Sequence, residues 1–181
     1  MPRIAAYESP FQVTLKGVAA GLVGTLVMTS ALQAIARLIV RPPAEPTELE
    51  AATAELTALD ATPPLPPTEQ VAERLASQVF HTELSLENRQ RIGMGIHWAY
   101  GACWGALSAQ LQLTMRPPAV PYGVALGLAV WAVGPARLVP ALGLYERPVS
   151  SGIFRRLLAV GLHVLYGVTT AMTLERLGAS R

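Results

Sequence analysis

Four stretches of the chain contain no Asp, Glu, Lys or Arg, and each is long enough for a helix that crosses a membrane. They are residues 17–36, 92–115, 117–136 and 157–174. A transmembrane helix needs roughly 17–25 apolar residues, because the hydrocarbon layer is ~30 Å thick. We therefore predict an all-α membrane protein, a four-transmembrane-helix bundle within a single membrane domain, residues 1–181. The expected helices are about 14–38, 91–114, 119–142 and 154–175.

A soluble bundle of long buried helices is the alternative architecture. Of the 181 residues, only 14% are charged and 51% are hydrophobic, a balance that a soluble domain of this size would struggle to bury. Buried helices of soluble proteins usually keep one polar face, whereas residues 17–36 offer only threonine, serine and Gln33. These features favour helices surrounded by lipid.

The segment between the first two windows has a different character. We expect an extramembrane loop over about 41–88, containing a proline-rich and glutamate-rich insert that ends in Pro63-Pro64-Leu65-Pro66-Pro67. Within this loop, residues 68–84 repeat apolar positions at helical spacing and predict an amphipathic helix. That helix would lie on the membrane surface, lie across the mouth of the bundle, or bind a partner protein.

The chain has no evident cleavable signal peptide, so the first helix is expected to direct it to a bacterial inner membrane. Lys and Arg near the helix ends divide seven against five between the two sides, which leaves the orientation of the termini open. The single cysteine, Cys103, excludes an intramolecular disulfide, and a net charge of +2 without a basic run gives no sign of nucleic-acid binding. The expected partners are the lipid bilayer and further copies of the chain or other membrane subunits.

The helices contain an internal repeat. Residues 17–22 (GVAAGL) match 123–128 (GVALGL), and residues 97–101 (HWAYG) match 163–167 (HVLYG). The pattern predicts two helical hairpins related by duplication and inserted in the same orientation. Glycines in these helices form small-xxx-small pairs, which let helix backbones approach closely. The pairs are Gly17/Gly21, Gly101/Gly105 and Gly123/Gly127.

The matched histidines and tyrosines form a candidate polar site within the membrane. His97 and Tyr100, like His163 and Tyr166, are three residues apart and therefore project from one helix face. A polar ring in lipid requires a partner, so this face should point into the bundle. Three interpretations remain open: an interhelical hydrogen-bond network that fixes helix register, a proton-linked site, or a pair of haem ligands.

Arg137 is the fifth member of the candidate site, because it is the most deeply placed charge. It follows Gly134-Pro135, which should kink the third helix and free a backbone carbonyl. Its guanidinium would snorkel to the interface or, alternatively, form a site for an anion or a lipid headgroup at the kink.

No catalytic or metal-binding constellation is present in the sequence. It has no nucleophile beside a base, no carboxylate pair in a membrane window and no His or Cys cluster, since His81 stands alone. An enzyme is therefore disfavoured, and we expect a structural or accessory protein, acting as a small oligomer or as a subunit of a membrane complex. The alternatives are a proton-linked or small-solute transporter that uses the five candidate residues, and a haem-binding electron carrier.

Several short motifs spread over most of residues 17–176 recur together in one protein family. They are the glycine-rich first helix, Pro63-Pro64-Leu65-Pro66-Pro67, His97, Pro140-Ala141-Leu142-Gly143-Leu144 with Pro148 after it, and Gly161-Leu162-His163. In these motifs the chain resembles the YagU-like family of bacterial inner-membrane proteins. The resemblance implies a multi-pass inner-membrane protein with no established activity.

Overall fold

The structure is a computed structural model that describes residues 9–39, 66–115, 117–141 and 153–178. These residues form helices and short connections without any strand, which confirms the predicted all-α class. The helices are α1 (Pro10–Ile39), α3 (Pro67–Val79), α4 (Leu86–Met115), α5 (Ala119–Val133), the π-helix η1 (Gly134–Leu138), α6 (Val139–Ala141) and α7 (Ile153–Arg176). The predicted insert over residues 41–65 lies outside the described residues.

Local sequence explains where several helices begin. Pro10 is the first residue of α1, Pro67 the first residue of α3, and Pro118 immediately precedes α5. Proline suits the start of a helix, because its fixed φ is already helical and its missing N–H would have no partner there. At the start of α4, the hydroxyl of Ser85 instead accepts a hydrogen bond from the N–H of Asn88 at 3.3 Å, the usual N-cap arrangement.

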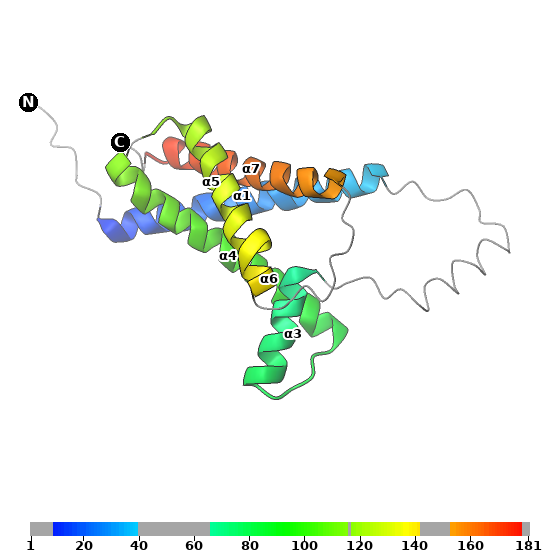
Figure 1. Ribbon diagram of the computed structural model, residues 1–181. Coiled ribbons are helices and arrows are strands. Elements are labelled where there is room, and N and C mark those ends of the chain that lie inside the picture. Colours follow the sequence, from blue (N-terminus) through cyan, green and yellow to red (C-terminus); the bar gives the residue numbers. More distant parts are fainter. Residues whose placement is uncertain (1–8, 40–65, 116, 142–152, 179–181) are drawn as a thin grey trace, which may run out of the picture.

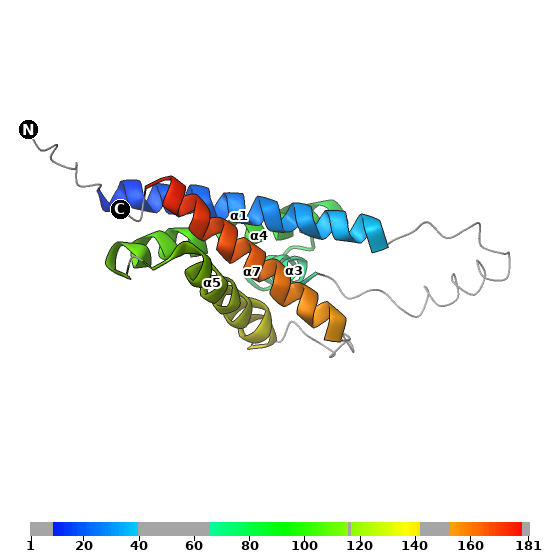
Figure 2. The same ribbon diagram turned by 90° about the horizontal axis from the view of Figure 1, so that it is seen from above.

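The long helices form two antiparallel pairs that are joined through α1 and α7. α1 packs along α4, and α5 packs along α7, while α1 and α7 contact each other between the two pairs (Figures 1 and 2). The beginning of α1 and the end of α7 lie at the same end of the molecule (Figure 1). α3 packs against α4 and lies below the other long helices in Figure 1, beside the first turns of α4.

Three helical segments are long and apolar enough to cross a membrane. They are Pro10–Leu38, Ala119–Leu138 and Arg156–Arg176. In the most apolar window of each, only 22% to 33% is buried inside the protein, so most of the apolar surface faces outward. An apolar exterior of this extent indicates a membrane protein and bears out the prediction for these three helices.

The fourth predicted span, α4, has the required length at 30 residues but is not among the described helices that are apolar enough. Its first turns carry Glu87, Arg89 and Arg91, and its interior face buries Ser108 and Gln112. These polar residues lower its average hydropathy even though the window 92–115 contains no formal charge. A fourth membrane crossing therefore remains a prediction.

Glycines let the paired helices touch backbone to backbone. A Cβ added at Gly17 would lie 2.6 Å from the carbonyl oxygen of Gly105, and one at Gly21 would collide with the carbonyl of Gly101. The second pair has the same kind of contact, because a Cβ at Gly123 would lie 2.5 Å from Cα of Val168. No side chain larger than hydrogen fits these positions without separating the helices.

The two pairs differ in register from what the repeat predicts. Gly105 lies between Gly17 and Gly21, and Gly167 lies in the same way between Gly123 and Gly127. The sequence match instead aligns Gly167 with Gly101, which is one helical turn away from Gly105. When the two helix pairs are compared by their packing, the second helix of each pair is therefore shifted by four residues from the alignment that the sequence match gives. The duplication itself remains a prediction.

The predicted kink at Gly134-Pro135 takes the form of a π-helix. The N–H of Val139 donates to the carbonyl of Gly134, five residues earlier, instead of four. Pro135 has no N–H to continue the α-helical ladder, so the chain accommodates it by widening one turn. The turn also places Gly134 against Tyr100, whose hydroxyl would lie 2.6 Å from an added Cβ.

Candidate functional site

The helices enclose a cavity of about 140 Å³ near the end of the bundle where α3 lies. Residues from α1, α3, α4, α5, η1, α6 and α7 line it. Four of the five predicted site residues, His97, Tyr100, His163 and Tyr166, are among them. The other lining side chains are mostly apolar, and none is an Asp, Glu, Lys or Arg.

The fifth candidate, Arg137, lies elsewhere. It is in η1 on an exposed position and does not line the cavity. The sequence does not reveal the direction of this side chain, because it depends on the widened π-helical turn. The snorkelling of the guanidinium stays a prediction.

His163 is held by its own helix. Its Nδ1 lies 2.7 Å from the carbonyl oxygen of Ala159, one turn earlier. A carbonyl oxygen only accepts, so Nδ1 carries the proton and Nε2 of the neutral ring carries a lone pair. Among the described residues, Nε2 has no hydrogen-bond partner. This nitrogen is also not fully buried. Because the ring lines the cavity, we infer that this lone pair is open to it.

His97 contacts α1 across the first helix pair. Its Nε2 lies 3.4 Å from Oγ1 of Thr29, a long hydrogen bond in which either atom can donate. Neither histidine bonds a tyrosine hydroxyl in the described part of the chain. His97 therefore takes part in an interhelical contact, His163 bonds a carbonyl of its own helix, and the two imidazoles share one cavity. The hydrogen-bond network and the proton-linked site both stay predictions.

Both tyrosines use their hydroxyl protons to join helices. The hydroxyl of Tyr166 donates to the carbonyl of Gly101 at 2.7 Å and thereby links α7 to α4. The hydroxyl of Tyr100 donates to the carbonyl of Val130 at 3.2 Å and links α4 to α5. These bonds fix helix register, which is the structural part of the predicted role.

The sequence analysis missed Thr25 and Met28, which line the cavity from α1. Thr25 is 1% exposed and donates to the carbonyl of Gly21 in its own helix, so in the sequence it looks like an ordinary packing residue. The signal that could have identified it is its position one turn after Gly21 and opposite Gly101. That inference requires the pairing of α1 with α4, which no local motif specifies.

α3 lies over the mouth of the cavity, one of the three positions predicted for the amphipathic helix. It contributes Pro67, Thr68 and Val71 to the lining. α3 approaches α4 closely at Gly93, where an added Cβ would lie 3.0 Å from the backbone nitrogen of Glu69. A helix from the segment between α1 and α4 therefore completes the wall of the site.

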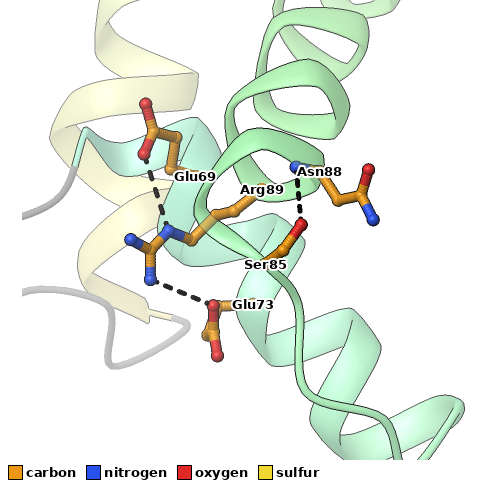
Figure 3. Close-up of polar contacts among 5 residues, drawn as sticks. All are labelled: Glu69, Glu73, Ser85, Asn88 and Arg89. Carbon is orange, nitrogen blue, oxygen red and sulfur yellow. Dashed lines mark hydrogen bonds and ion pairs between the residues drawn. The ribbon is translucent and has the colours of Figure 1, made fainter.

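Arg89 of α4 connects to α3 through two carboxylates. Its Nε lies 3.7 Å from Oε2 of Glu69, and its Nη1 lies 3.4 Å from Oε2 of Glu73 (Figure 3). The side chain of Arg89 is 21% exposed, so water screens these pairs only in part. The ion pairs and the close approach at Gly93 together hold α3 over the cavity.

Replacing Arg89 with methionine should release α3 from the bundle. Methionine keeps much of the apolar stem but leaves the carboxylates of Glu69 and Glu73 without their cation. Because these ion pairs are partly exposed, we expect their loss to cost about 1–2 kcal/mol in the free energy of docking α3 onto α4. We expect amide hydrogen exchange in α3 to become about tenfold faster, while exchange in α5 and α7 is unchanged. Hydrogen-exchange mass spectrometry in detergent measures both.

The matched control is Arg91→Met. Among the described residues, Arg91 forms an ion pair only with Glu87 of its own helix, and both side chains are more than 70% exposed, at 72% and 71%. Such a pair contributes at most a few tenths of a kcal/mol to helix stability. Equal acceleration of exchange in α3 by the two variants would show that Arg89 does not anchor this helix.

Neither a haem nor a metal cluster suits the described residues. A cavity of about 140 Å³ is close to the size of an engineered cavity that holds one benzene molecule, and a porphyrin is several times larger. No group of three or more His, Cys, Asp or Glu side chains in the described residues could hold a metal ion. The residues present therefore do not fit the haem-binding interpretation.

Comparisons test whether known proteins share this arrangement. A scan of protein-family models and searches of curated proteins and solved structures find no match to this chain. The resemblance to the YagU-like family stays a prediction, and the site's chemistry rests on its own residues.

Proposed function

We propose that this protein is a four-helix protein of a bacterial inner membrane that binds a small, mainly apolar solute in the cavity beneath α3 and passes it into or across the bilayer. The observation that carries the proposal is the cavity itself, which every described helix lines and which both histidines share. Pockets between the helices of a bundle, apolar with a few convergent polar groups, are common binding sites.

Support for a fourth crossing comes from the outer face of α4. Apolar side chains are exposed along its charge-free length: Ile92, Met94, Leu107, Leu111, Leu113 and Met115. The polar residues Ser108 and Gln112 are buried against the other helices, at 0% and 3% exposure. A helix that is apolar outside and polar inside suits a lipid environment, because polar side chains are kept out of contact with lipid.

A ligand accounts for the cavity better than a purely structural role does. The cavity is of the size of a site for one small ring, and its wall is mainly apolar with a few polar groups, as in ligand sites between helices. A bundle selected only for packing would fill such a space with side chains. Participation in a larger membrane complex is compatible with solute binding and was the first expectation from the sequence.

The solute-binding proposal is tested by filling the mouth of the cavity. Val71→Phe adds a ring on the side of α3 that lines the cavity, whereas Leu75→Phe adds one on the same helix at a position that is 46% exposed and outside the lining. A bound probe raises the stability of the folded state, so toluene should raise the melting temperature of the wild type and of Leu75→Phe in detergent. Val71→Phe should show a much smaller rise.

The pair of variants also controls for the action of toluene on the micelle. An effect of toluene on the detergent alone would be the same in both variants. If toluene leaves all three melting temperatures unchanged, or shifts them equally, the cavity does not bind such probes and the structural or accessory role is favoured instead.

A further inference from the structure

We infer that the solute is a neutral molecule with a small apolar, preferably aromatic, body and one hydrogen-bond donor, of the phenol class, which donates to Nε2 of His163. The inference rests on the proposed function, because it names the ligand class of the same cavity. It follows from the size of the cavity, the absence of charge in its lining, and the hydrogen-bond capacity that the protein leaves unused.

The lining excludes a charged ligand. No Asp, Glu, Lys or Arg of the described residues lines the cavity, so an ion would lose its hydration without gaining a counter-charge. The volume of about 140 Å³ accommodates a single six-membered ring. The rings of Tyr100 and Tyr166 are part of the wall, and aromatic rings pack favourably edge to face with an aromatic ligand.

Three hydroxyls of the wall favour a ligand that donates. The hydroxyls of Thr25, Tyr100 and Tyr166 already donate to the carbonyls of Gly21, Val130 and Gly101. Their protons are therefore engaged, and what they offer the cavity is acceptor capacity.

His163 is the strongest of these acceptors. Its Nδ1–H is engaged by Ala159, so the ring offers the cavity the Nε2 lone pair. The helical bond to Ala159 also fixes the ring orientation, in the way that a second partner orients a histidine ligand. A ligand hydroxyl that donates to Nε2 would satisfy the histidine atom that lacks a protein partner, whereas a ligand without a donor would leave it unsatisfied.

Phenol and toluene provide a matched pair of probes, because they have nearly the same shape and differ in one hydroxyl. Their dissociation constants are measured in detergent for the wild type, His163→Leu and His163→Gln. The ratio of the dissociation constant of toluene to that of phenol should fall about fivefold in His163→Leu relative to the wild type. This factor corresponds to the loss of one hydrogen bond. His163→Gln keeps an acceptor oxygen and should retain most of the preference. Partition into micelles cancels when ratios are compared between variants.

A second measurement on the wild type avoids dependence on the folding of the variants. The protein is labelled at histidine with a nitrogen isotope and observed by NMR. Bound phenol should shift one imidazole nitrogen signal, and toluene at equal occupancy should leave that signal unshifted. Both probes could bind while the ratio of their dissociation constants is unchanged in His163→Leu, or while no imidazole signal responds to phenol alone. Either result overturns this inference and leaves the proposed solute binding intact. Failure of both probes to bind overturns this inference together with the proposed function.

Discussion

Gly105→Leu is expected to prevent α1 and α4 from packing and so to abolish the folded bundle. A Cβ at Gly105 would lie 2.6 Å from Cα and 2.7 Å from the nitrogen of Gly21, and it would collide with the carbonyl of Gly17. All three atoms belong to the backbone of the facing helix, which cannot move aside without separating the pair. Overpacking of side chains costs about 1–3 kcal/mol, and a collision with backbone at this depth should exceed that range. Size-exclusion chromatography and thermal unfolding in detergent measure the loss.

Gly95→Leu is the matched control, because Gly95 lies in the same helix and an added Cβ there meets nothing within 4 Å. The variant should elute as the wild type does and differ in unfolding free energy by less than about 0.5 kcal/mol. The second helix pair offers the same comparison between Gly167→Leu, which faces the backbone of Gly123 and Gly127, and Gly161→Leu, which faces open space. Equal losses in Gly105→Leu and Gly95→Leu would contradict the close backbone approach.

The helices were predictable because a single physical requirement dominates them. Lipid tolerates neither charge nor unpaired backbone groups, so the charge-free windows coincide with helices such as α1, predicted over about 14–38 and observed at Pro10–Ile39. The same criterion is less decisive for α4. Absence of charge does not measure hydropathy, and buried polar residues such as Gln112 make α4 less apolar than the other long helices.

The register between helices was not predictable from the repeat. A match between Gly101 and Gly167 reports local similarity, whereas the packing partner of a glycine depends on bulky neighbours. In the first pair, the carbonyl of Gly101 lies beside Gly21; in the second, the carbonyl of His163 takes the same place beside Gly127. The packing thus pairs His163 with Gly101, whereas the sequence match pairs it with His97.

Only some of the residues that line the cavity could be predicted from the sequence. His97, Tyr100, His163 and Tyr166 could be placed on inward faces because polar rings avoid lipid, and all four line one space. The contribution of α3 could not be foreseen, because it depends on the close approach at Gly93 and on the distant pairing of Arg89 with Glu69 and Glu73. These contacts involve residues that, taken singly, look like an ordinary helix glycine and solvated charges.

Among the described residues, Tyr166→Ala should be the most damaging truncation of a side chain. Tyr166 is 2% exposed and the largest of the fully buried side chains, and it packs with Leu126 and Val130 of α5 while its hydroxyl reaches Gly101 of α4. Its ring also lies against Gly24 of α1. Truncation therefore removes contacts to three other helices at once, and we expect a loss of about 3–5 kcal/mol in unfolding free energy, measured by denaturant titration in mixed micelles.

Tyr166→Phe separates the ring from the hydroxyl, since it keeps the packing and removes only the hydrogen bond to Gly101. The carbonyl of Gly101 lies within α4 and keeps its helical environment, so this variant should lose about 1 kcal/mol. The difference between the variants then measures the contribution of the ring at the junction of the two helix pairs. If Tyr166→Phe is as unstable as Tyr166→Ala, the hydrogen bond from α7 to α4, rather than the packing of the ring, holds the pairs together.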